Sequence, residues 1–317
     1  NGGTGGIGGS GGAAEAGNVG GAGGASILDL NSATTATQAI GTLYINGGTG
    51  GLSGATSTKI GGVGGAGGAA TATIAGDFTG NIVLNDGTAG TVVGATAASA
   101  GGAATLTFDS LTDQEVTGNI TAASNNEGII NLTNGTRATS DIVTITGNIG
   151  TSSASIKSLT TAGATTDLAN VKVTGNVYIT TIDHGEAATW GDQSTLTMDL
   201  DGNVDFTTFN ITSGTNAATE IASVTVAGNM TGTTIALVDD ALHGVSLLTL
   251  DGDSAQTIGA AITASVTGEG NITVANTAGT VTFSEKVGDS AGNAVETITL
   301  NTGTTSVFNK AVDSTAI

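Results

Sequence analysis

Three pairs of apolar residues recur at a fixed distance near the end of this 317-residue chain, and no other feature limits its fold as strongly. The first members of the pairs are Ile258, Phe283 and Phe308, and the second member follows four residues later in each pair. Each step is 25 residues long. Self-similarity at a fixed period of about 20 to 50 residues is typical of chains that wind into stacked coils. The recurrence therefore predicts a repeat protein.

A second element recurs with nearly the same period: two apolar residues with one residue between them, a spacing typical of β-strands. We call the second apolar residue the anchor. The anchors, spaced by 28, 27, 26, 24, 24 and 26 residues, are Ile145, Val173, Leu200, Val226, Leu250, Val274 and Leu300. Their partners two positions earlier are Val143, Val171, Met198, Val224, Leu248, Ile272 and Ile298. We expect both sets to form inward-facing columns, with successive anchors paired as parallel strands.

The anchor series also extends towards the start of the chain. Ile45 and Ile74 lie 29 residues apart and read as two early anchors. Between them and Ile145, both Phe108 and Val116 resemble an anchor, and the register there stays open between the two.

A glycine follows most anchors at the same distance, usually with Asn after it. These glycines are Gly147, Gly175, Gly202, Gly228 and Gly252. Gly and Asn tolerate positive φ better than other residues, so a recurring Gly-Asn pair is typical of a tight corner. We expect these glycines to occupy stacked corners, with positive φ at some of them or at the residue that follows.

Composition agrees with a thin core rather than a large spherical one. The chain has 54 Gly, no Pro, no Cys and only 9 aromatic residues, and no long helical pattern is visible. The absence of Pro suits parallel strands, in which every N–H is needed for pairing. We therefore predict an all-β fold, a parallel β-solenoid of about ten coils with a repeat of 24–29 residues. We expect residues 1–68 to be a Gly-rich segment with Gly-Gly-x excursions from the first coils, and residues 69–317 to be the regular solenoid. The glycine triplets fit either a flexible surface loop or extended left-handed helices packed on the solenoid.

The net charge of −20, with only 6 Lys and Arg, argues against nucleic acid and anionic membrane surfaces as binding partners. Binding to nucleic acid needs clustered basic residues, and anionic membrane surfaces need them too, so both partners are disfavoured. No apolar run is long enough to span a bilayer as a helix.

Acidic residues at the corners make calcium the one cofactor to consider. The candidate ligands are Asp199, Asp201, Asp251 and Asp253. Calcium prefers oxygen ligands, and carboxylates stacked about 4.8 Å apart repel unless a cation bridges them. The Gly-Gly-x-Gly-x-Asp nonapeptide of calcium-binding β-rolls is absent.

Enzymatic chemistry finds little support in the sequence. The candidate carboxylate pairs of a glycoside hydrolase are Asp199 with Asp201, which share a strand face, and Asp251 with Asp253. These residues also read as ordinary corner and solvent-facing residues. Asp183, His184 and Glu186 could bind a divalent ion, yet a zinc site is disfavoured without Cys or a second nearby His. We expect no catalytic activity.

The segments Gly279–Phe283, Thr297–Leu300 and Thr304–Val312, together with the Val-Thr-Gly-Asn strings, resemble repeats of large bacterial surface proteins. These are the filamentous-haemagglutinin-like adhesins and the passengers of rickettsial-type autotransporters; the composition is also similar to that of Gram-negative surface-layer proteins. The resemblance covers roughly residues 116–317 and is one of texture and period. It implies an extracellular or cell-surface solenoid and brings no catalytic motif.

Three functions follow in order of preference. The first is a secreted structural protein that self-assembles into a surface layer or extracellular filament. The second is an adhesin or autotransporter passenger that binds a host or neighbouring cell, and the third is a polysaccharide-active enzyme. Because no capping element is legible at either end of the solenoid, we expect contacts between copies of the chain through the terminal coils or the Gly-rich segment.

Overall fold

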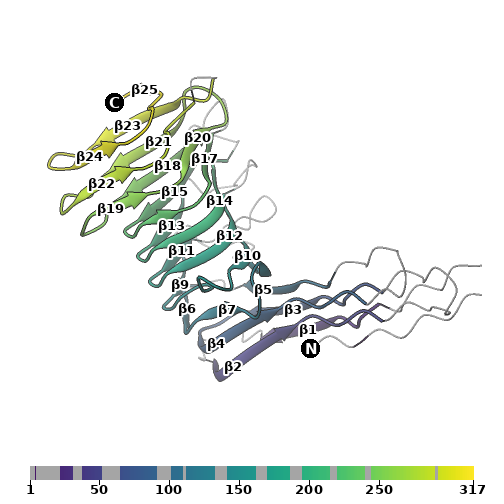
Figure 1. Ribbon diagram of the computed structural model, residues 1–317. Helices are drawn as coiled ribbons and strands as arrows, with labels where there is room; N and C mark the ends of the chain where they lie inside the picture. The colour runs from purple at the N-terminus through teal and green to yellow at the C-terminus, as the bar shows by residue number, and fades with distance from the viewer. Residues whose placement is uncertain are drawn as a thin grey trace, which may run out of the picture.

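The computed structural model describes residues 4, 22–30, 38–51, 65–90, 101–109, 112–132, 141–161, 170–185, 195–214, 220–239, 244–289 and 292–317. Within these ranges the chain forms β-strands and no helix (Figure 1). Every ladder between two strands is parallel. The strands rise as one stack from β2 to β25. The protein is a parallel β-solenoid, as the sequence predicts.

Two sheets form the walls of the solenoid. The 13-stranded sheet consists of β1 (Ser26–Leu30), β3 (Ala70–Ile74), β5 (Ala104–Phe108), β8 (Glu127–Asn131), β10 (Ile156–Thr160), β12 (Val177–His184), β14 (Val204–Thr212), β16 (Met230–Thr231), β17 (Thr234–Val238), β19 (Gln256–Ile258), β20 (Ala261–Ala264), β22 (Thr280–Phe283) and β24 (Thr305–Phe308). The 12-stranded sheet consists of β2 (Gln38–Asn46), β4 (Phe78–Asn85), β6 (Gln114–Thr117), β7 (Ile120–Ala122), β9 (Ile142–Ile145), β11 (Asn170–Val173), β13 (Thr195–Leu200), β15 (Ile221–Val226), β18 (Val245–Leu250), β21 (Glu269–Val274), β23 (Val295–Leu300) and β25 (Ser314–Ala316). The chain passes from one sheet to the other and back in each coil. The main path of each sheet runs through eleven strands. The expected number of about ten coils is therefore not matched in detail.

The anchor columns form as expected from β9 onwards. Val143 pairs with Val171 and Ile145 with Val173, and the same register continues to Ile298 and Leu300. Thirteen of the fourteen expected inward residues are fully buried, and their stacked side chains form the core of this wall. Leu300 is the exception, with 45% exposure, because β25 pairs only with Val295 and Thr297 and leaves it uncovered.

The 25-residue recurrence marks the opposite wall. Ile258 pairs with Phe283 and Phe283 with Phe308, while Val287 bridges Ile262 and Val312. The rings of Phe283 and Phe308 stack with centroids 4.6 Å apart and an interplanar angle of 8°. The prediction that these residues stack coil upon coil is confirmed.

The expectation that Ile45 and Ile74 are anchors of the same column is wrong. Ile45 pairs with Leu84 in the 12-stranded sheet, whereas Ile74 pairs with Phe108 in the 13-stranded sheet. Of the two open alternatives, Val116 is the anchor, since it pairs with Ile145. Long glycine-rich connections separate the early strands, so a constant spacing no longer identifies the same position in successive coils.

The corner glycines do stack, but the expectation of positive φ at these corners is wrong. None of the five glycines, and none of the residues that follow them, has a positive φ. A Cβ on Gly175 would instead collide with the carbonyl oxygen of Gly147, and one on Gly202 with that of Gly175. Close stacking, rather than backbone conformation, excludes side chains at these corners.

A ladder of asparagines runs beside the stacked glycines. The side-chain oxygen of each Asn accepts a hydrogen bond from a backbone N–H of the next coil, at 2.7–3.0 Å. The asparagines are Asn81, Asn119, Asn148, Asn176, Asn203 and Asn229, and the last one accepts from the N–H of Thr257. The ladder joins the corners of seven successive coils along the solenoid axis.

The described glycine segments near the start of the chain pack side by side. Gly48 and Gly68 exchange two backbone hydrogen bonds of 2.6 and 3.0 Å, and Gly90 donates to the carbonyl of Gly65 at 2.9 Å. Cβ atoms on Gly50 or Gly90 would collide with backbone of the neighbouring segment. These segments are therefore paired with each other, and the pairing includes residues 87–90 and 101–102, beyond the expected boundary at residue 68. Most of the Gly-Gly-x triplets of residues 1–21 lie outside the described residues.

Candidate functional site

Of the four calcium candidates, Asp199 projects from the outer face of β13, whereas Asp201, Asp251 and Asp253 lie in the corners that follow β13 and β18. Lys172 on β11 pairs with Asp199 on β13, so the two side chains project next to each other from adjacent coils. The Lys172 ammonium lies 2.5 Å from a carboxylate oxygen of Asp199 and 2.9 Å from one of Asp201. Lys172 therefore supplies a positive charge next to both carboxylates, so calcium is not the only cation that can offset their repulsion. The coil spacing predicts this pairing, since Asp199 follows Lys172 by 27 residues. A search for basic residues close in sequence to Asp199 does not find it.

Asp251 and Asp253 are two coils further along. Ala227 lies between Asp201 and Asp251 in the stack, as the hydrogen bonds of the Ala227 and Asp251 N–H groups to successive anchors show. Two coil steps correspond to about 10 Å. The structure therefore brings Asp199 and Asp201 together and leaves the other two carboxylates apart from them.

The charges in this area influence each other across the coils. Partial burial raises the pKa of the Asp251 carboxyl, and Asp199, Asp201 and Asp253 raise it further by repulsion. Partial burial also opposes the charge of Lys172, but its hydrogen bonds to Asp199 and Asp201 outweigh this and raise the pKa of the ammonium. Within the described ranges, no three His, Cys, Asp or Glu side chains meet in a geometry that could hold a metal ion. Calcium binding at Asp199, Asp201, Asp251 and Asp253 stays a prediction.

His184, at the end of β12, points into the solenoid and is fully buried. Its Nδ1 lies 3.0 Å from the hydroxyl of Thr161, and its Nε2 lies 3.3 Å from the carbonyl oxygen of Leu196. Since a carbonyl can only accept, Nε2 carries the proton and donates it, and Nδ1 accepts from Thr161. Burial lowers the pKa of His184 to about 4, although the hydrogen bonds to backbone carbonyls favour the charged form. Glu186, the third member of the Asp183–His184–Glu186 group, lies outside the described residues.

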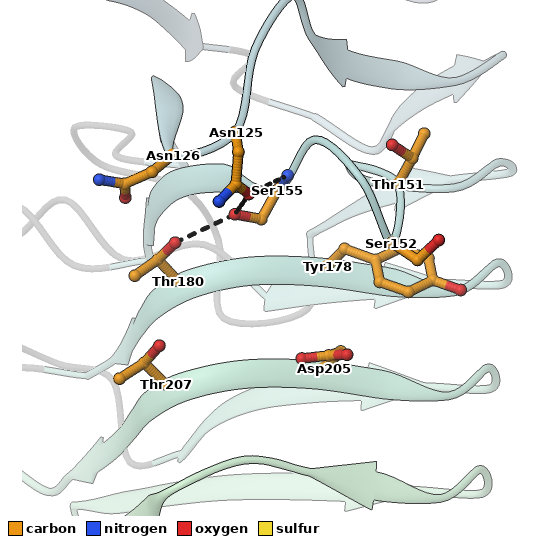
Figure 2. A pocket seen from close by; sticks show the side chains of 9 residues that line it. All are labelled: Asn125, Asn126, Thr151, Ser152, Ser155, Tyr178, Thr180, Asp205 and Thr207. Carbon is orange, nitrogen blue, oxygen red and sulfur yellow. Dashed lines mark hydrogen bonds between the residues drawn. The ribbon is translucent and has the colours of Figure 1, made fainter.

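A polar hollow of about 390 Å³ lies on the other wall, above the outer face of β12 and β14. Figure 2 shows its floor and its rim. Tyr178 and Thr180 project from β12, and Asp205 and Thr207 project from the neighbouring strand β14. The rim comes from two loops that belong to earlier coils, and its lining residues are Asn125, Asn126, Thr151, Ser152 and Ser155.

Hydrogen bonds tie the two rim loops to each other and to the floor. The side-chain oxygen of Asn125 accepts from the N–H and the hydroxyl of Ser155, at 3.1 and 2.8 Å. The Ser155 hydroxyl also lies 3.1 Å from the hydroxyl of Thr180. Thr151 and Ala154 close the second loop with two backbone hydrogen bonds of 3.0 and 3.1 Å. The rim is therefore held in place by the protein itself.

Three groups of the floor remain available to a ligand. Among the described residues, no hydrogen bond or ion pair engages the side chain of Tyr178, Asp205 or Thr207. Sequence reasoning did not find this site, because its residues are spread over more than 80 positions of the chain. A coil-by-coil comparison could have found it, since Asn125, Ser155, Thr180 and Thr207 follow each other at about one repeat.

Comparison with known proteins gives no further guide to the site. No protein-family model matches the chain, and no match was found among curated proteins or solved structures. In the part of the chain that the structure describes, no helix has the length and apolarity that a bilayer crossing needs.

Proposed function

We propose that the protein is an extracellular structural component of a bacterial surface, which assembles end to end with copies of itself into a filament or layer. The proposal is supported by one observation: core side chains are only partly covered at both ends of the described stack. Leu30 and Leu43 pack on the core at the first coils, and Phe308 and Val312 do so at the last coil. Their counterparts one coil inward, such as Phe283 and Val287, are 1% exposed.

The partly covered residues continue the interior columns. Leu300, Phe308 and Val312 stack on Val274, Phe283 and Val287. At the other end, Leu30 and Leu43 stack on Ile74 and Ile82. A second copy that seats its first coil on the last coil of the first would extend both columns and pair exposed strand edges. Such a head-to-tail contact does not close on itself, so it propagates.

Charge favours end contacts over side contacts. The net charge of −20 repels the flanks of two solenoids, whereas the last coil brings only Lys310 and the acidic Asp313. Lys310 is paired with Glu285 of the previous coil at 2.6 Å. Because salt screens this repulsion beyond about 8–10 Å at moderate ionic strength, the bias towards end contacts should be strongest at low salt.

Sedimentation velocity and negative-stain microscopy over a range of protein concentrations test the proposal. We expect rods that lengthen with concentration, and we expect Leu300→Asp to shorten or abolish them. Val266→Asp is the matched control, because Val266 has a similar exposure of 51% but lies between β20 and β21, away from the terminal coil. Monomers at every concentration, or rods that Leu300→Asp leaves unchanged, would contradict end-to-end assembly.

An adhesin is the second candidate, and the polar hollow favours it. A purely mechanical rod needs no preformed polar recess with unengaged hydrogen-bonding groups. The binding measurement described below separates this candidate from the first.

A further inference from the structure

We propose that the hollow between the two rim loops and strands β12 and β14 binds a neutral saccharide. Its volume of about 390 Å³ falls within the range of small-ligand pockets. The inference does not depend on the proposed assembly, because the hollow lies on a side wall and not on a terminal coil.

The chemistry of the lining matches sugar hydroxyls. Ser and Thr hydroxyls and Asn amides both donate and accept hydrogen bonds, and the lining consists of these groups together with one phenol and one carboxylate. Sugar hydroxyls likewise donate and accept, so each can pair with the lining without leaving a polar group unsatisfied. Asp205 adds a charged acceptor, whose hydrogen bonds are stronger than those between neutral groups. Tyr178 adds an aromatic surface next to a hydroxyl, which suits a ligand with both C–H and O–H faces.

Other ligand classes fit this lining less well. The described lining contains no Lys, Arg or His, so nothing compensates an anionic ligand beside Asp205. A divalent cation would find only one carboxylate here. An apolar ligand would bury the amides and hydroxyls of the rim without hydrogen bonds, at a cost for each group.

The hollow is also preorganised. The hydrogen bonds between Asn125 and Ser155 and between Ser155 and Thr180 join three successive coils, and the N–H of Asn126 donates to the carbonyl of Ser155 at 2.9 Å. Gly150, at the base of the second loop, has φ of 71°, and a Cβ there would collide with Tyr178. A fixed rim lowers the entropy lost when a ligand binds. The rim therefore uses its own hydrogen bonds for rigidity and leaves Tyr178, Asp205 and Thr207 to contact the sugar.

The test is a titration, followed by NMR, of the chain with a panel of neutral saccharides: glucose, galactose, mannose, N-acetylglucosamine and their disaccharides. We expect at least one of them to bind below about 10 mM and to shift the amide signals of Tyr178 and Asp205. Asp205→Asn should weaken this binding on the order of tenfold, because a charged acceptor becomes neutral. Glu115→Gln is the matched control, since Glu115 is also exposed but projects from β6 in the other sheet, and it should leave affinity unchanged.

Two outcomes would overturn the inference. One is the absence of binding by every neutral saccharide of the panel over this concentration range. The other is binding that Asp205→Asn does not weaken, or that shifts signals elsewhere on the solenoid. Asp205 is exposed and makes no side-chain hydrogen bond with the described residues, so the variant should keep its fold and either result can be interpreted. Assembly is measured separately by sedimentation, and its failure would not affect this result.

Discussion

The backbone N–H of Asn176 donates to the side-chain oxygen of Asn148 across 2.7 Å, and so joins the corners of two successive coils. Asn148→Ala removes this acceptor, and the expected loss of unfolding free energy is about 1 kcal/mol. Hydrogen exchange at the Asn176 backbone amide should also become faster in this variant, because the amide loses its hydrogen-bond acceptor. Thr174→Ala is the control, because the Thr174 side chain is exposed at the same corner and engages no described group. Equal protection of the Asn176 amide in both variants would show that the ladder contributes nothing.

Close stacking at the corners predicts an unusual sensitivity to alanine. Gly175→Ala places a Cβ against the carbonyl oxygen of Gly147, and we expect a destabilisation of about 1–3 kcal/mol, since backbone must shift to relieve the contact. Gly259→Ala should cost far less, because its Cβ would meet the carbonyl oxygen of Met230 at an ordinary 3.4 Å. Urea unfolding of the two variants gives the comparison. Similar midpoints for both would refute the steric explanation of the corner glycines.

The buried His184 predicts an acid-dependent loss of stability. Its pKa is about 4 in the folded chain and about 6.5 when unfolded, so only the unfolded chain takes up a proton between these values. The stabilising contribution is complete above pH 6.5, is lost as the pH falls to 4, and amounts to about 3 kcal/mol.

A variant isolates the histidine contribution from that of the carboxyl groups. His184→Gln cannot be protonated, so the difference in unfolding free energy between it and the parent should change with pH only between pH 6.5 and 4. Burial raises the pKa values of Asp239 and Asp251, which acts in the opposite direction, and both variants share that effect. A difference that stays constant with pH would contradict the assigned neutral histidine.

Lys172→Met tests the ion pairs on the outer face. We expect a loss of at most about 1 kcal/mol at low salt, and less at high salt, because the charges are partly exposed and screened. Lys157→Met is the control, since Lys157 is exposed and forms no ion pair with the described residues. Thermal unfolding at two salt concentrations checks the prediction, and a salt-independent loss would indicate that packing of the lysine stem matters more than its charge.

The sequence contains enough information to predict the stacking but not the contacts between coils. Ile258, Phe283 and Phe308 reveal the fold because each coil must fill the same narrow cross-section, which keeps both residue type and spacing constant. Ile45 and Ile74 lead to a wrong assignment because glycine segments lengthen the early coils. A spacing of about one repeat there no longer places two residues at the same position of successive coils. The Lys172–Asp199 pair and the hollow depend on side chains of neighbouring coils. Their lateral arrangement follows from register, which only the strand pairing defines.

The asparagine ladder also affects how such a chain can change its length. The corners at Asn148, Asn176, Asn203 and Asn229 are joined by the same type of hydrogen bond, from a backbone N–H to an Asn side-chain oxygen. Any one of these corners could therefore form this bond with any other. Deletion or duplication of one complete coil therefore restores the junction, whereas removal of a few residues within a coil displaces every later contact. The solenoid can therefore become longer or shorter by whole coils without loss of the hydrogen bonds between corners.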